Sequence, residues 1–433
     1  MSHPNKKKIL ILYADAGFGH RSAANAVQQA LKIAHSEDCE ATLVNPLEDS
    51  RAPALLRESQ SDYDRILKTM PELYRIGYEA SDGSLPVALM DGAFILMLYD
   101  VMRDLVEEHK PDAIVTTYPA YQSPLDALFL VGEKRIPLLT VITDLVSVHR
   151  TWFNQGVDRC LVPTEEVRHQ ARQALLSDEQ IKITGIPVSP AFSLQTASRE
   201  ELLARIGMSG ERHTLLVLGS KRIDDMPEIL RGLNHSALPI QFILVAGGDN
   251  ELHQRFLEEK WHVPVKILNF VENVPELMLA SDMLICKAGG LAVSEGLACG
   301  KPLILVNVLP GQEAGNAEYV IAHQAGELAK DALHLLEICH DWLENDAAEL
   351  KQKQQIARQI GFPNAAFHVA EEAWLAANQA PETGSIAHLF ERSHILKMLR
   401  KYRDDLKSLS LSNALEDKIL HPGLDPHHQD RDS

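Results

Sequence analysis

The chain is poor in cysteine, in aromatic residues and in positive charge. Its 433 residues carry 42 Lys and Arg against 60 Asp and Glu, a formal net charge of −18 that opposes binding to nucleic acid. The five cysteines have neither metal-site spacing nor an even count, and they stand at Cys39, Cys160, Cys286, Cys299 and Cys339. These shortages exclude a disulfide-stapled secreted domain and favour a cytoplasmic protein with reduced, buried thiols.

Long apolar runs are absent as well. No run reaches the roughly 18 residues of a membrane-spanning helix. The amino-terminal MSHPNKKKILILY has a basic flank, but its apolar run is short and leads directly into a glycine-containing loop, which predicts a first strand and not a signal peptide. Hydrophobic residues make up 45% and charged residues 24%, as in globular proteins, and the length predicts two domains.

The most informative stretch is residues 282–320, where apolar runs alternate with polar loops. Residues 283–286 and 303–306 are continuous apolar runs, as expected of parallel strands covered on both faces. A loop and a segment of helical composition follow each run. Because open α/β sheets bind ligands at the carboxyl ends of their strands, these loops predict a binding site.

The same loops carry side chains suited to a phosphorylated sugar. Gly289 and Gly290 allow backbone to approach a ligand at the start of a helix, where free N–H groups favour a phosphate. Glu295, about one turn further, can accept the hydroxyls of a ribose. The second loop adds the directional donors and acceptors that a sugar needs, on Gln312, Glu313 and Asn316. The alternative is an ordinary strand–helix–strand unit whose glycines serve packing alone.

The motif K-A-G-G-L-A-V-S-E-G-L-A-C-G-K-P, followed by P-G-Q-E-A-G-N-A, resembles a known family. It is similar to the sugar-nucleotide half of the monogalactosyldiacylglycerol synthases and processive diacylglycerol glucosyltransferases, relatives of the peptidoglycan glycosyltransferase that makes lipid II. The resemblance covers about residues 8–375. It implies an α/β GT-B fold, in which two Rossmann-like domains face each other across a cleft. The expected ranges are an acceptor domain at 1–190, a UDP-sugar domain at 197–378, and an amphipathic helix with a disordered tail at 379–433.

The amino-terminal half supplies a candidate base. A predicted strand at 8–13 leads into Gly17, Gly19 and His20, and the missing third glycine leaves a nicotinamide-cofactor site as a weak alternative. The amino end of the helix predicted at 21–33 would keep His20 neutral, so that it can take a proton from an attacking hydroxyl. Simple helix capping is the other reading. The resemblance implies that the loop of G-x-G-H-x-x-A-A, with Gly19, faces the sugar donor.

Three more candidates follow the apolar run at 136–143. Asp144 stands at the carboxyl end of that predicted strand and is a second candidate base or acceptor-positioning residue. His149 is a third such candidate. His149 and Trp152 match the family's T-D…H…W pattern, and the resemblance implies that both lie in the acceptor region. Asp144 and His149 are equally compatible with loop residues that are satisfied locally.

Two further strand ends in the second half complete the predicted donor site. Gly219 and Ser220 follow the apolar run at 212–218 and precede two cations at 221–222, a sensible diphosphate site. The resemblance implies that Phe270 packs on uracil and that Val271 borders the base. No obligatory cofactor or metal is predicted, because the two D-x-D matches, at 62–64 and 430–432, fall in helical and disordered context.

Two segments leave a membrane contact open. The apolar patch at 93–101 fits either a core helix or a surface that meets the bilayer or acyl chains. The basic amphipathic segment at 386–407 fits either a helix docked on the protein or one lying on a membrane.

Together, the residues and the resemblance predict an inverting transferase. It would move a hexose from UDP-glucose or UDP-galactose to the hydroxyl of diacylglycerol, as a peripheral enzyme on the cytoplasmic face of the membrane. Another lipid or polyprenyl acceptor, or a non-catalytic UDP-sugar sensor, remains an alternative. The sequence does not choose between the two sugars.

Overall fold

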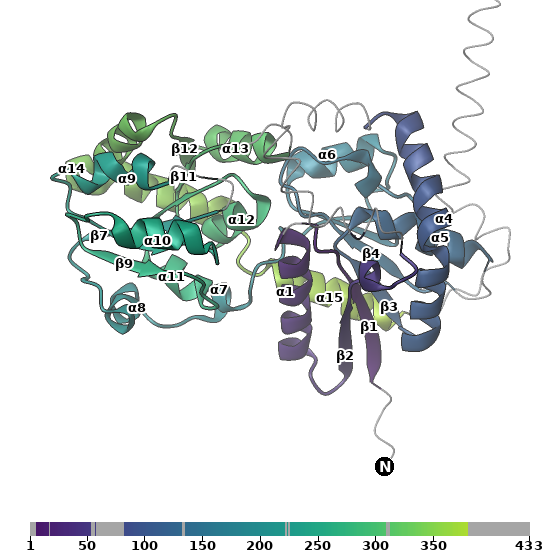
Figure 1. Cartoon of the computed structure of the whole chain (residues 1–433). Helices are drawn as coiled ribbons and strands as arrows, with labels where there is room; N and C mark the ends of the chain where they lie inside the picture. Colours follow the sequence, from purple (N-terminus) through teal and green to yellow (C-terminus); the bar gives the residue numbers. More distant parts are fainter. Residues whose placement is uncertain are drawn as a thin grey trace, which may run out of the picture.

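The chain folds into two α/β domains that lie side by side (Figure 1). The computed structural model describes residues 6–16, 18–52, 57, 82–131, 135–220, 223, 226–308 and 312–379. Several predicted features lie outside these residues: Gly17, both D-x-D matches, the cations at 221–222, and the amphipathic helix and tail from 380 onward.

The first domain is built on six parallel strands in the order β2-β1-β3-β4-β5-β6. The strands are β1 Lys7–Leu12, β2 Cys39–Val44, β3 Ala113–Thr116, β4 Leu138–Val141, β5 Arg159–Val162 and β6 Ile181–Ile183. The helices are α1 Phe18–Ala34, α4 Ser84–His109, α5 Gln122–Val131 and α6 Glu165–Gln173, with short 3-10 turns η1 Pro46–Glu48, η2 Pro119–Tyr121 and η3 Arg150–Trp152. Every residue of β3 and β4 is buried, as their apolar runs predict.

The second domain repeats this plan with the strand order β12-β11-β10-β7-β8-β9. Its strands are β7 His213–Leu218, β8 Ile240–Val245, β9 Val265–Leu268, β10 Met283–Cys286, β11 Leu303–Leu305 and β12 Gly326–Leu328. Its helices are α7 Ala191–Leu194, α8 Arg199–Ile206, α9 Met226–Asn234, α10 Asn250–Glu258, α11 Val274–Ala280, α12 Gly290–Ala298, α13 Gln312–Ala322 and α14 Ala332–Ile360.

The last described helix returns to the first domain. Although α15 (Ala365–Ala377) follows the second sheet in sequence, it packs against α1, β1 and β3 (Figure 1). Small buried side chains such as Ala366 and Ala370 allow this close packing against Val27. The predicted range 197–378 therefore contains one helix that belongs by packing to the first domain, and this helix ties the two domains together.

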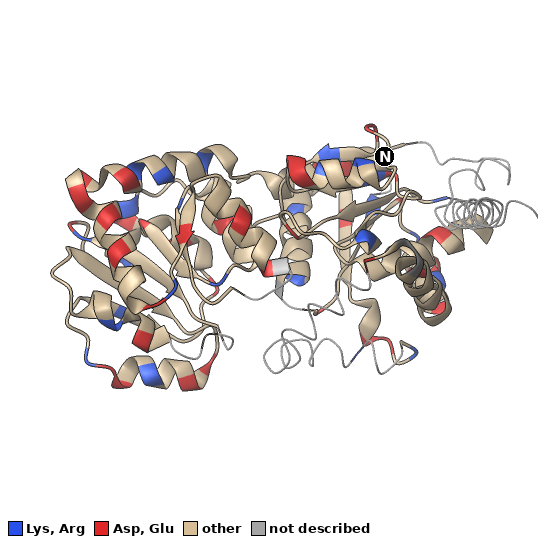
Figure 2. Cartoon of the chain, turned by 90° about the horizontal axis from the view of Figure 1, so that it is seen from above, with Lys and Arg blue, Asp and Glu red and all other residues tan. Residues whose placement is uncertain are grey.

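The long helix α4 contains the predicted apolar patch. Leu98, Val101 and Met102 are buried in the first core, whereas Leu96 is 88% exposed and Leu89 67% exposed. The patch is thus part core and part surface. No described helix is long and apolar enough to cross a membrane. Figure 2 shows acidic and basic residues mixed along the helices and fewer of them on the strands, as expected of covered sheets.

The strand order places the functional loops. It reverses between β1 and β3 in the first sheet and between β7 and β10 in the second. Ligands of doubly wound sheets bind outside the carboxyl ends of the strands at such reversal points. The loop before His20 follows β1, and the loops with Gly219 and Gly289 follow β7 and β10.

Candidate active site

His20 lies in the first turn of α1, beside the reversal point of the first sheet. Its Nδ1 is 3.2 Å from the hydroxyl of Thr143, and its backbone carbonyl accepts a hydrogen bond of 3.0 Å from the hydroxyl of Thr117. The edge of the Tyr118 ring packs 5.2 Å from the imidazole, and the ring of Trp152 lies 6.0 Å away. These contacts fix the imidazole at the predicted position.

The protonation state of His20 suits a base. Burial lowers the pKa of His20 to about 4, so the imidazole is neutral at pH 7. In the tautomer whose Nδ1–H donates to the Thr143 hydroxyl, Nε2 carries the free lone pair. A neutral imidazole with one nitrogen held in this way can accept a proton at the other.

Asp144 follows Thr143 in the chain, in the segment where the first domain meets the second. Burial raises the pKa of Asp144 to about 7, so the carboxyl group exchanges between its two forms near neutral pH. The following amide, the N–H of Leu145, donates 3.1 Å to the side chain of Asn316 in the second domain. Asp144 therefore stands in the chain between Thr143, which contacts the predicted base, and Leu145, which contacts the second domain. It stays the alternative candidate for the base.

The structure separates the two predicted acceptor-region residues. Trp152 is 2% exposed and lies beside His20. His149 is buried and caps η3, where its Nδ1 accepts from the N–H of Thr151, and its Nε2 is 3.8 Å from Asp82. Burial lowers the pKa of His149, while Asp82 and Asp91 oppose the shift. The contacts of His149 correspond to the alternative of a loop residue satisfied locally.

The glycines that open α12 have different neighbours. A Cβ placed on Gly290 would lie 2.8 Å from the backbone oxygen of Thr143 in the first domain, so this position must be glycine for the domains to meet. A Cβ on Gly289 would meet only the flexible end of Lys287, at 3.0 Å. Gly289 therefore leaves open space at the helix start, where a phosphate is favoured.

Glu295 lies in the second turn of α12, the helix that Gly290 begins. Burial raises the pKa of Glu295 to about 8. The hydrogen bonds among the described residues include none to its carboxyl group. A half-buried carboxyl group without a protein partner is suited to a polar ligand, in keeping with the predicted ribose contact.

The remaining predicted donor residues line two strand ends. Gly219 donates 2.7 Å to the carbonyl of Val245, and a Cβ there would collide with that same oxygen, so the glycine serves strand packing as well. The next residue, Ser220, is half-buried. Phe270 is 70% exposed after β9, while Val271 packs partly on the core. The Phe270 ring thus has a free face on which a base can stack.

The three residues predicted to hold the sugar differ in how far their side chains are already buried and hydrogen-bonded. Asn316 is 1% exposed: its Nδ2 donates 3.0 Å to the carbonyl of Ala288, and its Oδ1 accepts from Leu145. Glu313 accepts a 2.7 Å hydrogen bond from Lys287. Gln312 begins α13, and its side chain lies outside the described residues. Their contact with a sugar stays a prediction, and the amide of Asn316 is already used between the domains.

Sequence reasoning missed several residues that shape the site. Thr117, Tyr118 and Thr143 contact His20, and Ser147 and Gly315 meet across the domain boundary. Lys287 bonds Glu313 beside Gly289, within the second domain. Thr143 had a signal, since it is the last polar residue of the predicted strand before Asp144. Gly315 stands in the P-G-Q-E-A-G-N-A motif, but its contact with Ser147 had no signal, because only folding brings the two residues together.

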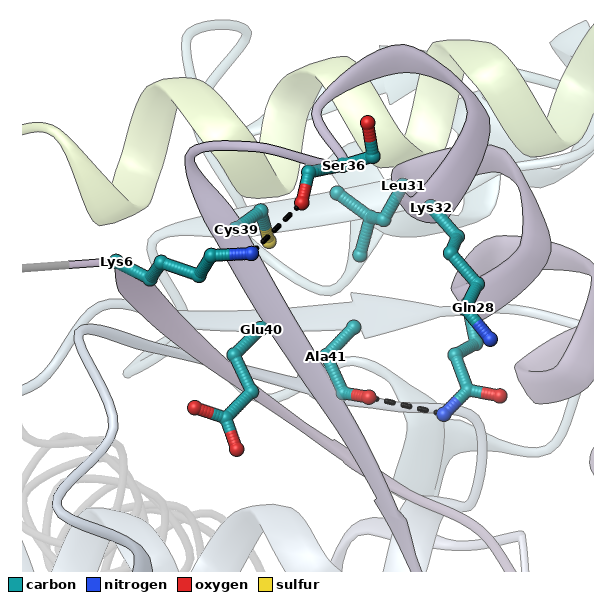
Figure 3. A pocket seen from close by; sticks show the side chains of 8 residues that line it. All are labelled: Lys6, Gln28, Leu31, Lys32, Ser36, Cys39, Glu40 and Ala41. Atoms are coloured by element: carbon teal, nitrogen blue, oxygen red, sulfur yellow. Dashed lines mark hydrogen bonds between the residues drawn. The ribbon is translucent and has the colours of Figure 1, made fainter.

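A separate cavity of about 460 Å³ lies at the opposite end of the first sheet. Lys6, Gln28 and Cys39 are among its lining residues, beside the first residues of β1 and β2 (Figure 3). Lys6 donates to the carbonyl of Ser36 and Gln28 to that of Ala41. Parallel sheets bind ligands at the carboxyl ends of their strands, so this cavity is not the candidate active site. Among the described residues, no three His, Cys, Asp or Glu are grouped to hold a metal ion.

Two family models match this chain. Residues 20–188 match the family described as monogalactosyldiacylglycerol (MGDG) synthase, and residues 218–368 match the glycosyltransferase family 28 C-terminal domain. The chloroplastic monogalactosyldiacylglycerol synthase 3 of Arabidopsis thaliana is 30% identical over 379 residues, covering 84% of this chain and 80% of its own. A probable chloroplastic monogalactosyldiacylglycerol synthase of Glycine max is 31% identical over 379 residues, covering 84% and 71%.

Solved structures confirm the predicted GT-B fold. Acinetobacter baumannii MurG superimposes with a TM-score of 0.55 at 15% identity, covering 86% of this chain and 100% of its own. A UDP-glucosyltransferase from Polygonum tinctorium superimposes with a TM-score of 0.56 at 13% identity, covering 87% and 100%. At such low identity these likenesses establish the fold alone. The extended sequence identity establishes more: this chain belongs to the monogalactosyldiacylglycerol synthase family and is a glycosyltransferase.

Proposed function

We propose that the protein transfers galactose from UDP-galactose to the free hydroxyl of diacylglycerol, with inversion at the anomeric carbon. The named activity of the relatives supports both the sugar and the acceptor, since their product is monogalactosyldiacylglycerol. The observation that carries the proposal is the neutral imidazole of His20, held by Thr143 where the first domain meets the amino end of α12.

The chemical step is a single displacement. The hydroxyl oxygen of diacylglycerol attacks the anomeric carbon and forms the new glycosidic bond. The bond from that carbon to the phosphate oxygen breaks, and its electron pair leaves with UDP. Nε2 of His20 takes the hydroxyl proton, a role that Asp144 would have to fill if it were the base.

The second domain would bind UDP and stabilise its developing charge. The N–H groups at Gly289 and Gly290 and the positive end of α12 favour the diphosphate as it departs. Glu295 would hold the ribose, and the exposed face of Phe270 would stack on the uracil. Each contact uses a residue that the sequence or the family resemblance assigned to the donor site.

The first domain offers apolar surface for a lipid. Leu89 and Leu96 project from α4, with exposed fractions of 67% and 88%. Such residues are suited to the headgroup boundary of a bilayer, where the hydroxyl of diacylglycerol lies. We infer peripheral association of this helix with the membrane that carries the acceptor.

The test is transfer of radiolabel from UDP-galactose or UDP-glucose to vesicles with and without diacylglycerol. We expect diacylglycerol-dependent label in the lipid phase, with UDP-galactose the better donor. If label enters only vesicles that contain a different lipid or a polyprenyl acceptor, that compound and not diacylglycerol is the acceptor. Binding of UDP by calorimetry without transfer to any acceptor would indicate a sensor.

A further inference from the structure

Residues 143–147 belong to the first domain but contact the second at three points. The N–H of Leu145 donates to Asn316, and the carbonyl of Thr143 lies against Gly290. Ser147 lies against Gly315: a Cβ placed on Gly315 would be 2.9 Å from the Cβ of Ser147. Both glycines are thus explained by the approach of this one segment.

The segment is also anchored within its own domain. The carbonyl of Leu145 accepts a 2.7 Å hydrogen bond from the hydroxyl of Thr164, and the carbonyl of Val146 accepts 2.6 Å from Gln170. Both donors lie at α6, Thr164 as its N-cap residue. The segment is thus hydrogen-bonded to both domains, so its backbone position depends on how the second domain sits against the first.

One end of the segment holds the candidate base. The Thr143 hydroxyl is 3.2 Å from Nδ1 of His20, while the carbonyl of the same residue touches Gly290 at the start of α12. A single residue therefore contacts both the imidazole and the helix that is expected to hold the diphosphate.

The middle of the segment, at Leu145, is held by one buried amide. Asn316 bonds the segment through Oδ1 and the carbonyl of Ala288 through Nδ2, so it joins residues 143–147 to the loop that precedes α12. Removing this amide would leave one N–H and one carbonyl group without their partners at the boundary, which is costly for buried groups.

We propose that residues 143–147 form a positioning segment, which seats the first domain on the donor loop and orients His20 through Thr143. Asn316 then acts as a positioning residue, the clamp of this segment, and not as a ligand of the sugar. The inference rests on the proposed function, because it concerns the base and the donor loop of that reaction.

The decisive variant is Asn316→Ala, compared with Glu318→Ala on the exposed side of the same helix. Loss of the clamp should lower kcat by about 10- to 100-fold through misplacement of the base, with UDP and UDP-galactose affinities within about twofold of the parent. Amide hydrogen exchange of the peptide with residues 143–147 should become faster in Asn316→Ala and stay unchanged in Glu318→Ala.

A paired substitution separates positioning from general damage. Gly315→Ala should force the segment away from α13 and lower kcat about as much as Asn316→Ala does. Adding Ser147→Gly removes the side chain that collides with the new methyl group, so the double variant should regain at least part of the lost kcat.

Three results would overturn the inference. They are a UDP-galactose affinity that falls about tenfold in Asn316→Ala while UDP affinity holds, unchanged exchange of residues 143–147, and no recovery on adding Ser147→Gly. If the parent protein transfers no hexose to diacylglycerol, the proposed function fails instead. The exchange experiment still reports on the clamp in that case.

Discussion

The two domains share a plan but differ in the chemistry that they bring to it. Each has six parallel strands and places its functional loops beyond the strands at the reversal point. The first domain contributes ionisable side chains there, His20 and Asp144, whereas the second contributes mainly backbone at Gly289 and Gly290, with Glu295 behind it. The same edge of the sheet, at the carboxyl ends of the strands, is therefore suited to proton transfer in the first domain and to anion binding in the second.

Burial explains how these ionisable groups work together. It lowers the pKa of His20 to about 4 and raises those of Asp144 and Glu295 to about 7 and about 8. All three shifts favour the neutral form. Negative charge that develops on a departing UDP would then meet N–H dipoles, and the carboxyl groups of Glu295 and Asp144 would oppose it less than fully ionised carboxylates would.

The largest test of this comparison is removal of the base. His20→Ala should lower kcat by about 10²- to 10⁴-fold, because proton acceptance is lost, while UDP affinity stays unchanged. Transfer assays and UDP calorimetry measure the two effects. His169→Ala, an exposed histidine on α6, is the matched control. A His20→Ala enzyme with the parent's kcat would remove the assignment.

The pH dependence separates His20 from Asp144. A base must be deprotonated, so His20, with a pKa of about 4, should support a nearly constant rate from pH 8 down to about 5.5. If Asp144 were the base, protonation below its pKa of about 7 would reduce the rate by about 30-fold at pH 5.5. The measurement is kcat/KM for diacylglycerol at saturating donor, repeated on Asp144→Asn.

Glu295→Gln should affect binding in the second domain and stability in the opposite sense. Losing the carboxyl group should raise the Kd for UDP about tenfold. The folded pKa of about 8 exceeds the ordinary value of 4.5, so the parent protein loses stability as pH rises between these values. The amide does not ionise. The free energy of unfolding should therefore be about 4 kcal/mol higher in the variant at pH 7.5, and only about 1 kcal/mol higher at pH 5.

Calorimetry with UDP and urea unfolding at both pH values measure these effects. An unchanged Kd for UDP would show that Glu295 does not hold the ribose. An equal gain in stability at pH 5 and pH 7.5 would show that ionisation of the carboxyl group is not its cause.

The smallest effect is expected at the exposed ring beyond β9. Phe270→Ala should weaken UDP binding about fivefold through lost stacking on the base. Stability should change by less than about 0.5 kcal/mol, since the side chain is 70% exposed. Leu257→Ala, another exposed apolar residue of this domain, should leave UDP affinity unchanged. Equal UDP affinities in the two variants would contradict the stacking contact.

Local sequence determined the elements and the residues that stand at their ends. The apolar runs at 8–13, 136–143 and 283–286 became buried parallel strands, because residues covered on both faces must be apolar throughout. His20 and Glu295 could be identified because a strand end and the following helix are adjacent in the chain. The resemblance to the family extended this reading to the GT-B fold.

Tertiary structure alone decided which partners these residues meet. Gly290 and Asn316 also meet Thr143 and Leu145 of the first domain, and the Asn316–Leu145 bond joins residues 171 positions apart. Likewise α15 follows the second sheet in sequence and packs on the first. Composition and spacing record the neighbours of a residue along the chain, whereas these contacts arise when two separately folded sheets are brought together. That is why the sequence indicated the chemistry of this protein and only the folded chain showed how its two halves are joined.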